Sequence, residues 1–325
     1  MKIARALQNI SSLTTPDVGD NNITEQAADN IAAVLSHNTN LQVLNLHGNN
    51  LQTAGGIKIA RALQNIPSLR ELYVGNNNIT EEATDDIIAV LSHNANLQVL
   101  HLHGNNLQTA KITRILQNMS SLTTLDIGGN SITKEAASDI AAVLSHNTNL
   151  CVLGLYGINS QTAAGAIKIA RALQSTSSLT ELYVGSNHIT EEAVDDIAAI
   201  LSHNTNLQVL SLNANNLQTA GAIKIARALQ NISSLTKLDV GSNNIAEEAA
   251  DDIAAVLSHN TNLQVLILHA NNLQNAGAIK LTRPLQNSSS LTTLDIGNNN
   301  ITEEATDDIA AVLSHNANLQ LLGLQ

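Results

Sequence analysis

Two histidines, His101 and His103, stand two residues apart in a short apolar stretch. In a β-strand, side chains two residues apart point to the same side, so this spacing places both imidazoles on one face. Two imidazoles on one strand can begin a zinc site, and His47 and His269 occupy the position of His103 in related stretches. Because no third and fourth ligand is evident from the sequence, solvated polar contacts are the simpler interpretation. We therefore predict no metal and no cofactor.

A Ser-His-Asn triplet brings nucleophile and base side chains together at six places, from Ser36–Asn38 to Ser314–Asn316. Six identical copies are typical of a device that ends a helix, not of a single catalytic site. The sequence shows no Gly-rich phosphate loop, no paired catalytic carboxylates and no Cys and His residues at metal-ligand spacing. We predict that the protein is not an enzyme.

These residues belong to a repeat whose pattern is L-x-x-L-x-L-x-x-N-x-L, as in Leu41 to Leu51. Its first leucine recurs with a step of 28 residues, except for one step of 25 and one of 29. The twelve starts are Leu13, Leu41, Leu69, Leu97, Leu122, Leu150, Leu179, Leu207, Leu235, Leu263, Leu291 and Leu319. A nearly fixed period of this length predicts a repeat array in which each unit packs only on its neighbours.

Each repeat combines a strand pattern with a helix pattern. The L-x-L alternation predicts a short strand, and apolar positions at helical spacing follow it, as in Ile223, Ala226 and Leu229. Parallel strands lie about 4.8 Å apart whereas helices with side chains need about 10 Å, so stacking places the helices outside a curve. We predict an α/β solenoid, a horseshoe with a parallel β-sheet on its concave face and α-helices on its convex face. Residues 1–325 then form a single domain of about 11 full 28-residue units with partial units at both ends.

An asparagine stands at the ninth position of nearly every repeat, where the chain leaves the strand. An inward amide there can bond backbone groups of its own turn and of the adjacent turn. We predict a structural asparagine ladder formed by Asn21, Asn49, Asn77, Asn105, Asn130, Asn187, Asn215, Asn243, Asn271 and Asn299. The repeat from Leu150 has Ile158 at this position. It is then either the least stable repeat, because backbone groups are left unpaired, or it is rescued by Asn159 through a one-residue bulge.

With this pattern, the chain resembles the leucine-rich repeat family in its ribonuclease-inhibitor-like subtype. The helix text GAIKIARALQNISSL and EEATDDIAAVLSHNANL is most similar to the sensor region of NOD-like receptors. That resemblance implies a non-enzymatic scaffold with a ligand-sensing or autoinhibitory role, which binds a protein or microbial ligand on its concave face. The alternative that the resemblance implies is a cytosolic inhibitor or regulator of an enzyme, similar to ribonuclease inhibitor or to Ran GTPase-activating proteins.

Composition limits the environment and the partners. The formal charge of −12 disfavours nucleic acid, which requires clustered Lys and Arg on one face. No apolar run approaches the roughly 18 residues of a membrane span, and the lone Cys151 fits a reducing compartment, so we expect a cytoplasmic protein. The sequence begins within a helical half-unit and stops at Gln325 soon after a repeat start. We therefore expect self-association through uncapped ends.

Charged residues alternate between successive helices. A Lys and Arg pair marks every second helix, such as Lys224 and Arg227, and the helices between them are acidic, as in Glu81, Glu82 and Asp85. This alternation favours the correct stacking register, although each exposed ion pair contributes only about 0–1 kcal/mol.

Positions on the predicted concave face vary between otherwise near-identical repeats. All three tyrosines project from that face, and Tyr and Arg are enriched at binding hot spots. The simpler explanation is that exposed strand positions tolerate many residues and that Tyr favours strands. We nevertheless predict a partner-binding face made of Arg70, Glu71, Tyr73, His101, His103, Asp126, Tyr156, Glu181, Tyr183, Lys237 and Asp239.

Overall fold

The computed structural model describes residues 13–107, 113, 120–158, 164–172, 177–230, 232–286, 290–314 and 316–324. Contacts group the chain into two compact units, residues 1–160 and residues 161–325. The division falls in the repeat from Leu150, where the sequence departs from its pattern.

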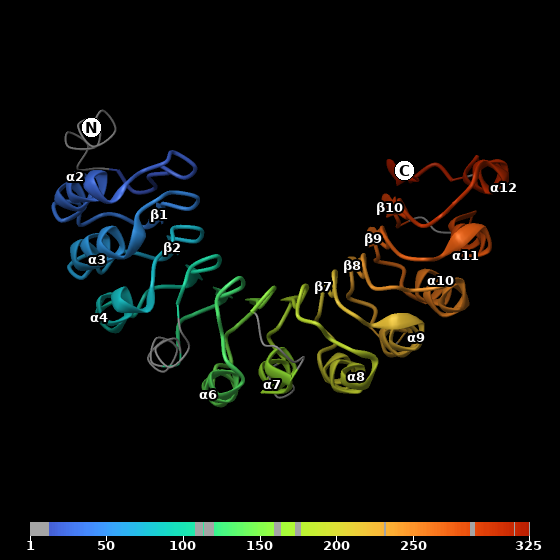
Figure 1. Ribbon diagram of the computed structural model, residues 1–325, viewed down its shortest axis with the longest axis horizontal. Coiled ribbons are helices and arrows are strands. Elements are labelled where there is room, and N and C mark those ends of the chain that lie inside the picture. Colours follow the sequence, from blue (N-terminus) through green and yellow to red (C-terminus); the bar gives the residue numbers. More distant parts are fainter. Residues whose placement is uncertain are drawn as a thin grey trace. The chain divides into compact units, whose positions relative to one another are not determined.

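The first unit alternates helices with short parallel strands that follow one another in chain order (Figure 1). Its elements are α2 (Glu25–Leu35), β1 (Val43–Asn45), α3 (Gln52–Leu63), β2 (Glu71–Tyr73), η1 (Glu81–Ala83), α4 (Thr84–His93), β3 (Val99–His101), β4 (Thr124–Asp126), α6 (Lys134–Leu144) and β5 (Val152–Gly154).

The second unit repeats this arrangement (Figure 1). Its elements are α7 (Ala164–Ala172), β6 (Glu181–Tyr183), η3 (Glu191–Ala193), α8 (Val194–His203), β7 (Val209–Ser211), α9 (Gln218–Leu229), β8 (Lys237–Asp239), η4 (Glu247–Ala249), α10 (Ala250–His259), β9 (Val265–Ile267), α11 (Gln274–Thr282), η5 (Arg283–Gln286), β10 (Thr293–Asp295), α12 (Glu303–Leu313) and β11 (Leu321–Gly323).

Most strands are three residues long around a buried leucine, and the residue on each side of that leucine is more exposed. In β2, for example, Leu72 is buried between the half-exposed Glu71 and Tyr73. Neighbouring strands pair in register, so Leu44 lies beside Leu72 and Leu72 lies beside Leu100. Since side chains alternate along a strand, the leucines face the helices and their neighbours face away. The predicted α/β repeat architecture, with strands in one layer and helices in the other, is confirmed.

Buried asparagine amides connect successive repeats. Asn105 Oδ1 accepts hydrogen bonds from the backbone N–H groups of Asn77 and Ile79 at 3.1 and 3.0 Å. Its Nδ2 donates to the carbonyl oxygens of Val74 and Leu102, each at 3.0 Å. Corresponding bonds form at Asn49, Asn77, Asn130, Asn187, Asn215, Asn243, Asn271 and Asn299. Asn21 differs, because it is exposed and its amide donates to Gly19 of its own turn.

In the irregular repeat from Leu150, a backbone carbonyl oxygen replaces one hydrogen-bond acceptor of the asparagine ladder. The Ile158 side chain is fully buried, and its carbonyl oxygen accepts a hydrogen bond from the N–H of Ile132 at 3.1 Å. In a regular repeat, the corresponding N–H of Ile79 bonds to a ladder amide. The N–H of Ile132 is thus paired without a side-chain amide, while the predicted bulge at Asn159 lies outside the described residues.

Ion pairs join neighbouring helices within each unit. In the first unit Lys58 Nζ lies 2.9 Å from Asp29 on α2, and in the second unit Lys224 Nζ lies 3.1 Å from Asp195 on α8. Arg227 extends the other way, to Asp252 on α10 at 2.8 Å. These pairs are largely exposed, so each contributes about 0–1 kcal/mol. Among the described residues, no helix combines the length and apolar character needed to cross a bilayer.

Candidate functional site

The face of the sheet opposite the helices carries three rows of side chains in the first unit. Strand register aligns Asn45, Tyr73, His101, Asp126 and Gly154 in one row. The row on the other side of the buried leucines is Val43, Glu71, Val99, Thr124 and Val152. Two residues beyond the first row, His47, Gly75, His103, Gly128 and Tyr156 form a third row, tied by backbone hydrogen bonds just beyond the strand ends. We call these three rows the open face.

Two glycines of the third row make room for the rings beside them. A Cβ atom added to Gly75 would lie 2.6 Å from the His103 ring, and one added to Gly128 would lie 2.5 Å from the Tyr156 ring. Both distances are well below van der Waals contact. The rings of His103 and Tyr156 can therefore lie over the neighbouring turns only because Gly75 and Gly128 have no side chain.

Five rings gather on the open face as a consequence. The ring centroids of Tyr73 and His101 lie 4.7 Å apart, and those of His101 and His103 lie 5.9 Å apart. His103 also lies 5.0 Å from His47 and 6.2 Å from Tyr156. We call His47, Tyr73, His101, His103 and Tyr156 the ring cluster.

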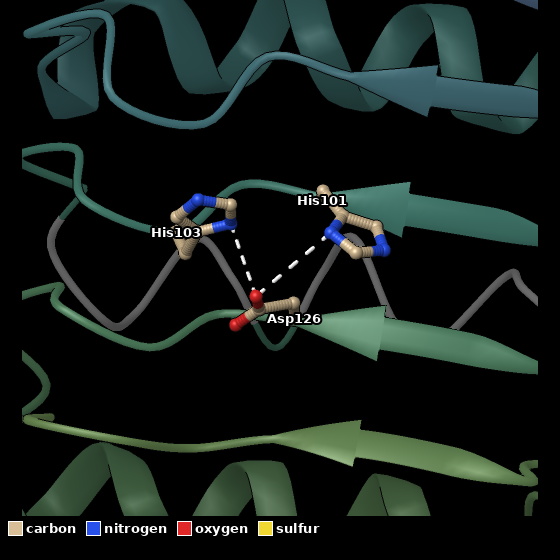
Figure 2. A group of neighbouring side chains, drawn as sticks. All are labelled: His101, His103 and Asp126. Carbon is tan, nitrogen blue, oxygen red and sulfur yellow. Dashed lines mark ion pairs between the residues drawn. The ribbon is translucent and has the colours of Figure 1, made fainter. Parts of the chain in front are cut away.

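Asp126 lies beside two imidazoles of the ring cluster (Figure 2). Its Oδ2 is 3.0 Å from His103 Nδ1 and 3.8 Å from His101 Nδ1, while its Oδ1 accepts a hydrogen bond from the N–H of Gly128 at 3.0 Å. The Nδ1 atom of His103 is buried and has no hydrogen-bond partner. The carboxylate oxygen therefore lies close to this nitrogen but outside the directional range of a hydrogen bond.

The charge states follow from burial and from these neighbours. Burial lowers the pKa of His101 more than the nearby Asp126 raises it, so the His101 imidazole favours its neutral form. Burial by itself would raise the pKa of Asp126, but His103, the N–H of Gly128 and His101 outweigh it and lower that pKa. At neutral pH the cluster thus offers a neutral imidazole beside an ionised carboxylate.

Tyrosine hydroxyls on strands β2 and β6 are held by glutamates two residues earlier. Tyr73 donates to Glu71 Oε2 at 2.8 Å in the first unit, and Tyr183 donates to Glu181 Oε2 at 2.7 Å in the second. Burial and the adjacent glutamate raise the pKa of Tyr73 to about 12 and raise that of Tyr183 as well. Burial, with a smaller contribution from Asp126, raises the pKa of Tyr156.

The second unit contains a related but smaller cluster. His269 Nδ1 lies 3.9 Å from Asp295 Oδ2, and the His269 ring lies over Gly241 as His103 lies over Gly75. Ile267 occupies the position that corresponds to His101, so this pair lacks a second imidazole.

The structure separates the predicted partner-binding residues into two sets. Glu71, Tyr73, His101, His103, Asp126 and Tyr156 lie together on the open face of the first unit. Glu181, Tyr183, Lys237 and Asp239 lie on strands β6 and β8 of the second unit. Arg70 is exposed but precedes β2, out of phase with Glu71 and Tyr73.

Sequence reasoning placed Asp126 on the predicted binding face but did not recognise it as a possible third ligand beside His101 and His103. Asp126 stands in the same repeat position as His101, one repeat later, and the register places the two residues on adjacent strands. The contact of His47 with His103, and the glycines that allow it, depend on ring orientations that no pattern in the sequence specifies.

Histidines of four Ser-His-Asn triplets contact carbonyl oxygens of their own helices. In the first of them, Ser36 Oγ lies 3.1 Å from His37 Nδ1, a distance that a catalytic pair would also show. Both atoms, however, contact the carbonyl oxygen of Ala33, at 3.0 and 2.8 Å. The pair therefore caps backbone groups at the end of α2.

Models of leucine-rich repeats match several parts of the chain. The model described as Leucine Rich repeats (2 copies) matches residues 39–87. The model described as Leucine Rich repeat matches residues 118–141, 203–226, 231–254, 259–281 and 287–305. No curated protein sequence matches the chain.

Solved structures of similar fold include two proteins from Listeria monocytogenes and a receptor. An internalin (inlF) from strain 4b F2365 is 21% identical, with a TM-score of 0.53 over 99% of this chain and 93% of that chain. The functional domain of InlJ, described as including a cysteine ladder, is 18% identical, with a TM-score of 0.50 over 98% of this chain and 64% of that chain. A TDR receptor is 15% identical, with a TM-score of 0.51 over 99% of this chain and 57% of that chain. These likenesses concern the fold, and together with the matched repeats they identify the chain as a leucine-rich repeat protein.

Proposed function

We propose that this leucine-rich repeat protein is a non-enzymatic scaffold that binds a protein partner on the open face of its first unit. The observation that carries the proposal is the ring cluster, in which Tyr156 remains 39% exposed although rings pack beside it. A large exposed aromatic side chain within a preformed group of rings is typical of a binding anchor.

The charge of the open face favours a partner with basic side chains. Glu71 and Asp126 lie on this face, and the whole chain has a formal charge of −12. A complementary basic partner would be attracted over a Debye length of about 8–10 Å at physiological ionic strength. Nucleic acid is disfavoured for the same reason.

Substitutions on the two sides of the repeat test this proposal. Tyr156→Ala removes the exposed anchor, whereas Lys224→Ala changes an outer helix and removes one exposed ion pair. Proteins captured from a lysate by the full chain provide the partner, whose affinity for each variant is then measured. We expect Tyr156→Ala to weaken binding by about 2 kcal/mol or more, as hot-spot residues do, and Lys224→Ala to leave it unchanged. Equal losses would place the interface elsewhere.

A ligand-sensing or autoinhibitory role similar to that of NOD-like receptors, in the cytoplasm, is the more specific form of the proposal. The style of the repeats and the lone Cys151, which fits a reducing compartment, support it. An inhibitor or regulator of an enzyme is the alternative, and the acidic charge would suit a basic enzyme. Fractionation of the source cells tests the location, since recovery of the protein outside the cytoplasm would overturn this form while leaving the scaffold proposal intact.

Self-association is part of the same proposal. Leu321 on β11 is 52% exposed, and exposed apolar residues on a strand favour pairing with another chain. We expect concentration-dependent light scattering from the unmodified chain, and a lower signal from Leu321→Lys. Equal scattering from both chains would exclude this strand as the contact.

A further inference from the structure

We propose that His101, His103 and Asp126 bind a Zn²⁺ ion on the open face of the first unit. Within the described residues, each of the three offers a ligand atom, and these atoms all lie within 4.8 Å of one another. Both histidines belong to one strand and its exit, and Asp126 belongs to the adjacent strand in register with His101 (Figure 2). The expectation of no metal rested on the lack of a third ligand, and in this proposal Asp126 is that ligand.

The distances are near those of a metal centre. Zinc binds imidazole nitrogens and carboxylate oxygens at about 2.0–2.2 Å, so tetrahedral ligand atoms lie about 3.3 Å apart. Asp126 Oδ2 is already 3.0 Å from His103 Nδ1 and 3.8 Å from His101 Nδ1. The distance from Asp126 Oδ2 to His101 Nδ1 is therefore the one that must shorten when the ion binds.

Buried His103 Nδ1 is the observation that points to a ligand. It lies 3.0 Å from Asp126 Oδ2 without forming a hydrogen bond of good geometry, so the two atoms are close but poorly joined. A bound cation would pair with this nitrogen and with Asp126 Oδ2 at once. Asp126 Oδ1 is held by the N–H of Gly128, the kind of outer contact that orients a metal ligand.

The combination of two imidazoles and one carboxylate favours zinc over calcium and magnesium. Calcium and magnesium take oxygen ligands, whereas zinc accepts nitrogen and oxygen together. Three protein ligands leave a coordination position for water or for a side chain of a partner. The proposed ion lies on the surface proposed above for partner binding, but its binding does not depend on that function.

The second unit supplies an internal control. His269 and Asp295 repeat the arrangement of His103 and Asp126 at 3.9 Å, with Ile267 in place of His101. The substitution His101→Ile therefore converts the first cluster into the second. Because isoleucine is a natural occupant of this strand position, we expect the variant to fold.

Calorimetric titration of the metal-free full chain with ZnCl₂ tests the proposal. We expect one tight equivalent of Zn²⁺, and a loss of affinity of about 100-fold or more in His101→Ile and in Asp126→Asn, because even outer contacts of metal sites contribute 10–100-fold. The control substitution His269→Ala should leave the tight equivalent unchanged. X-ray absorption of the zinc-loaded chain should show nitrogen and oxygen ligands without sulfur.

Several results would contradict the proposal that zinc binds at this site. One is a tight equivalent that survives in His101→Ile, which would assign the zinc to surface histidines such as His37 or His203. An equal loss in His269→Ala, or the absence of tight zinc binding by the folded chain, would also contradict it. Tighter binding of Mg²⁺ than of Zn²⁺ would exclude the nitrogen ligands. Circular dichroism of each variant separates a lost ligand from a lost fold.

Discussion

Tyr73 is held by a carboxylate that it would repel if it lost its proton. Its hydroxyl donates to Glu71 Oε2 at 2.8 Å, and burial together with this glutamate raises its pKa to about 12. The ordinary value for tyrosine is about 10. The folded state therefore holds this proton more tightly than the unfolded state does. Its contribution to stability is complete below about pH 10 and is lost as the pH rises through about 12.

We predict that Glu71→Gln lowers the pKa of Tyr73 toward 10, although burial keeps it above that value. The chain has three tyrosines and no tryptophan, so tyrosinate absorbance in an alkaline titration reports these residues directly. Thr124→Ala, a change on the open face without a carboxylate, is the control and should leave the curve unchanged. A curve for Glu71→Gln identical to that of the unmodified chain would contradict the role of Glu71.

Asn105 pairs with two backbone N–H groups of the preceding repeat, those of Asn77 and Ile79. We predict that Asn105→Ala lowers the free energy of unfolding by about 1–3 kcal/mol for each N–H left unpaired. Neighbouring Asn106 is exposed, and Asn106→Ala should change stability by less than about 0.5 kcal/mol. Urea denaturation measures both changes, and similar losses for the two variants would refute the ladder's contribution.

At the scale of single residues, positions were more predictable than contacts. The ninth-position pattern predicted that asparagines such as Asn105 bond to the backbone, because a repeated turn needs the same backbone hydrogen bonds each time. It did not predict that Ile158 would be buried while its carbonyl bonds Ile132, since backbone groups carry no residue signature. The His103 and Asp126 contact likewise depends on side-chain rotation over Gly75.

Helix α3 differs from its counterparts at one buried position. Gly56 stands where α9 has Ala222 and α11 has Ala278. Beside it is an apolar cavity whose lining includes Leu72, Ile79 and Ile87. A glycine within a helix costs about 0.5–1 kcal/mol relative to alanine. The added methyl group would lie 3.1 Å from Ile79 Cδ1, which borders the cavity and has room to move by a few tenths of an ångström.

We predict that Gly56→Ala raises the free energy of unfolding by about 0.5–1 kcal/mol. The adjacent Gly55→Ala is the matched control, because its Cβ would lie 3.3 Å from Ala28 Cβ and 3.4 Å from the backbone of Glu25 on the neighbouring helix. It should therefore stabilise less or destabilise. Thermal unfolding of both variants tests this, and a destabilised Gly56→Ala would show that Ile79 cannot yield.

The sequence predicted where several helices end, but only part of the hydrogen bonding at those ends. The triplets Ser36–Asn38 and Ser258–Asn260 stand at helix ends, and their asparagines also reach the preceding repeat. Asn38 Nδ2 donates to the carbonyl oxygen of Leu13 at 2.7 Å, and Asn260 Nδ2 donates to that of Ile232 at 2.8 Å. Pro284 shortens α11, which ends at Thr282 before a 3-10 turn. That effect follows from the missing N–H of proline.

For the whole molecule, the period predicts the order of strands and helices but not the grouping of contacts. Two repeats depart from the 28-residue step, the one that begins at Leu97 and the one that begins at Leu150. The boundary between the compact units falls within the second of these repeats, between residues 160 and 161. Repeats of near-identical sequence make the same contacts with their neighbours. A repeat of irregular sequence therefore marks where the contact pattern changes.

Stability in such an array should therefore be local. Asn271 Oδ1 accepts from the N–H groups of Asn243 and Ile245, and its Nδ2 donates to Val240 and Leu268. All of these partners lie in two adjacent repeats of the second unit. Because each repeat packs mainly on its neighbours, loss of these bonds should open those repeats without opening distant ones.

We predict that Asn271→Ala speeds amide hydrogen exchange at Asn243 and Ile245 and along β8 and β9, while β1 and β2 of the first unit keep their protection. Hydrogen exchange measured by mass spectrometry under native conditions resolves these segments. The exposed Asn272 provides the control, and Asn272→Ala should leave the exchange of both units unchanged. An equal increase across both units in Asn271→Ala would mean that the chain opens as one cooperative body, because local opening leaves distant amides protected.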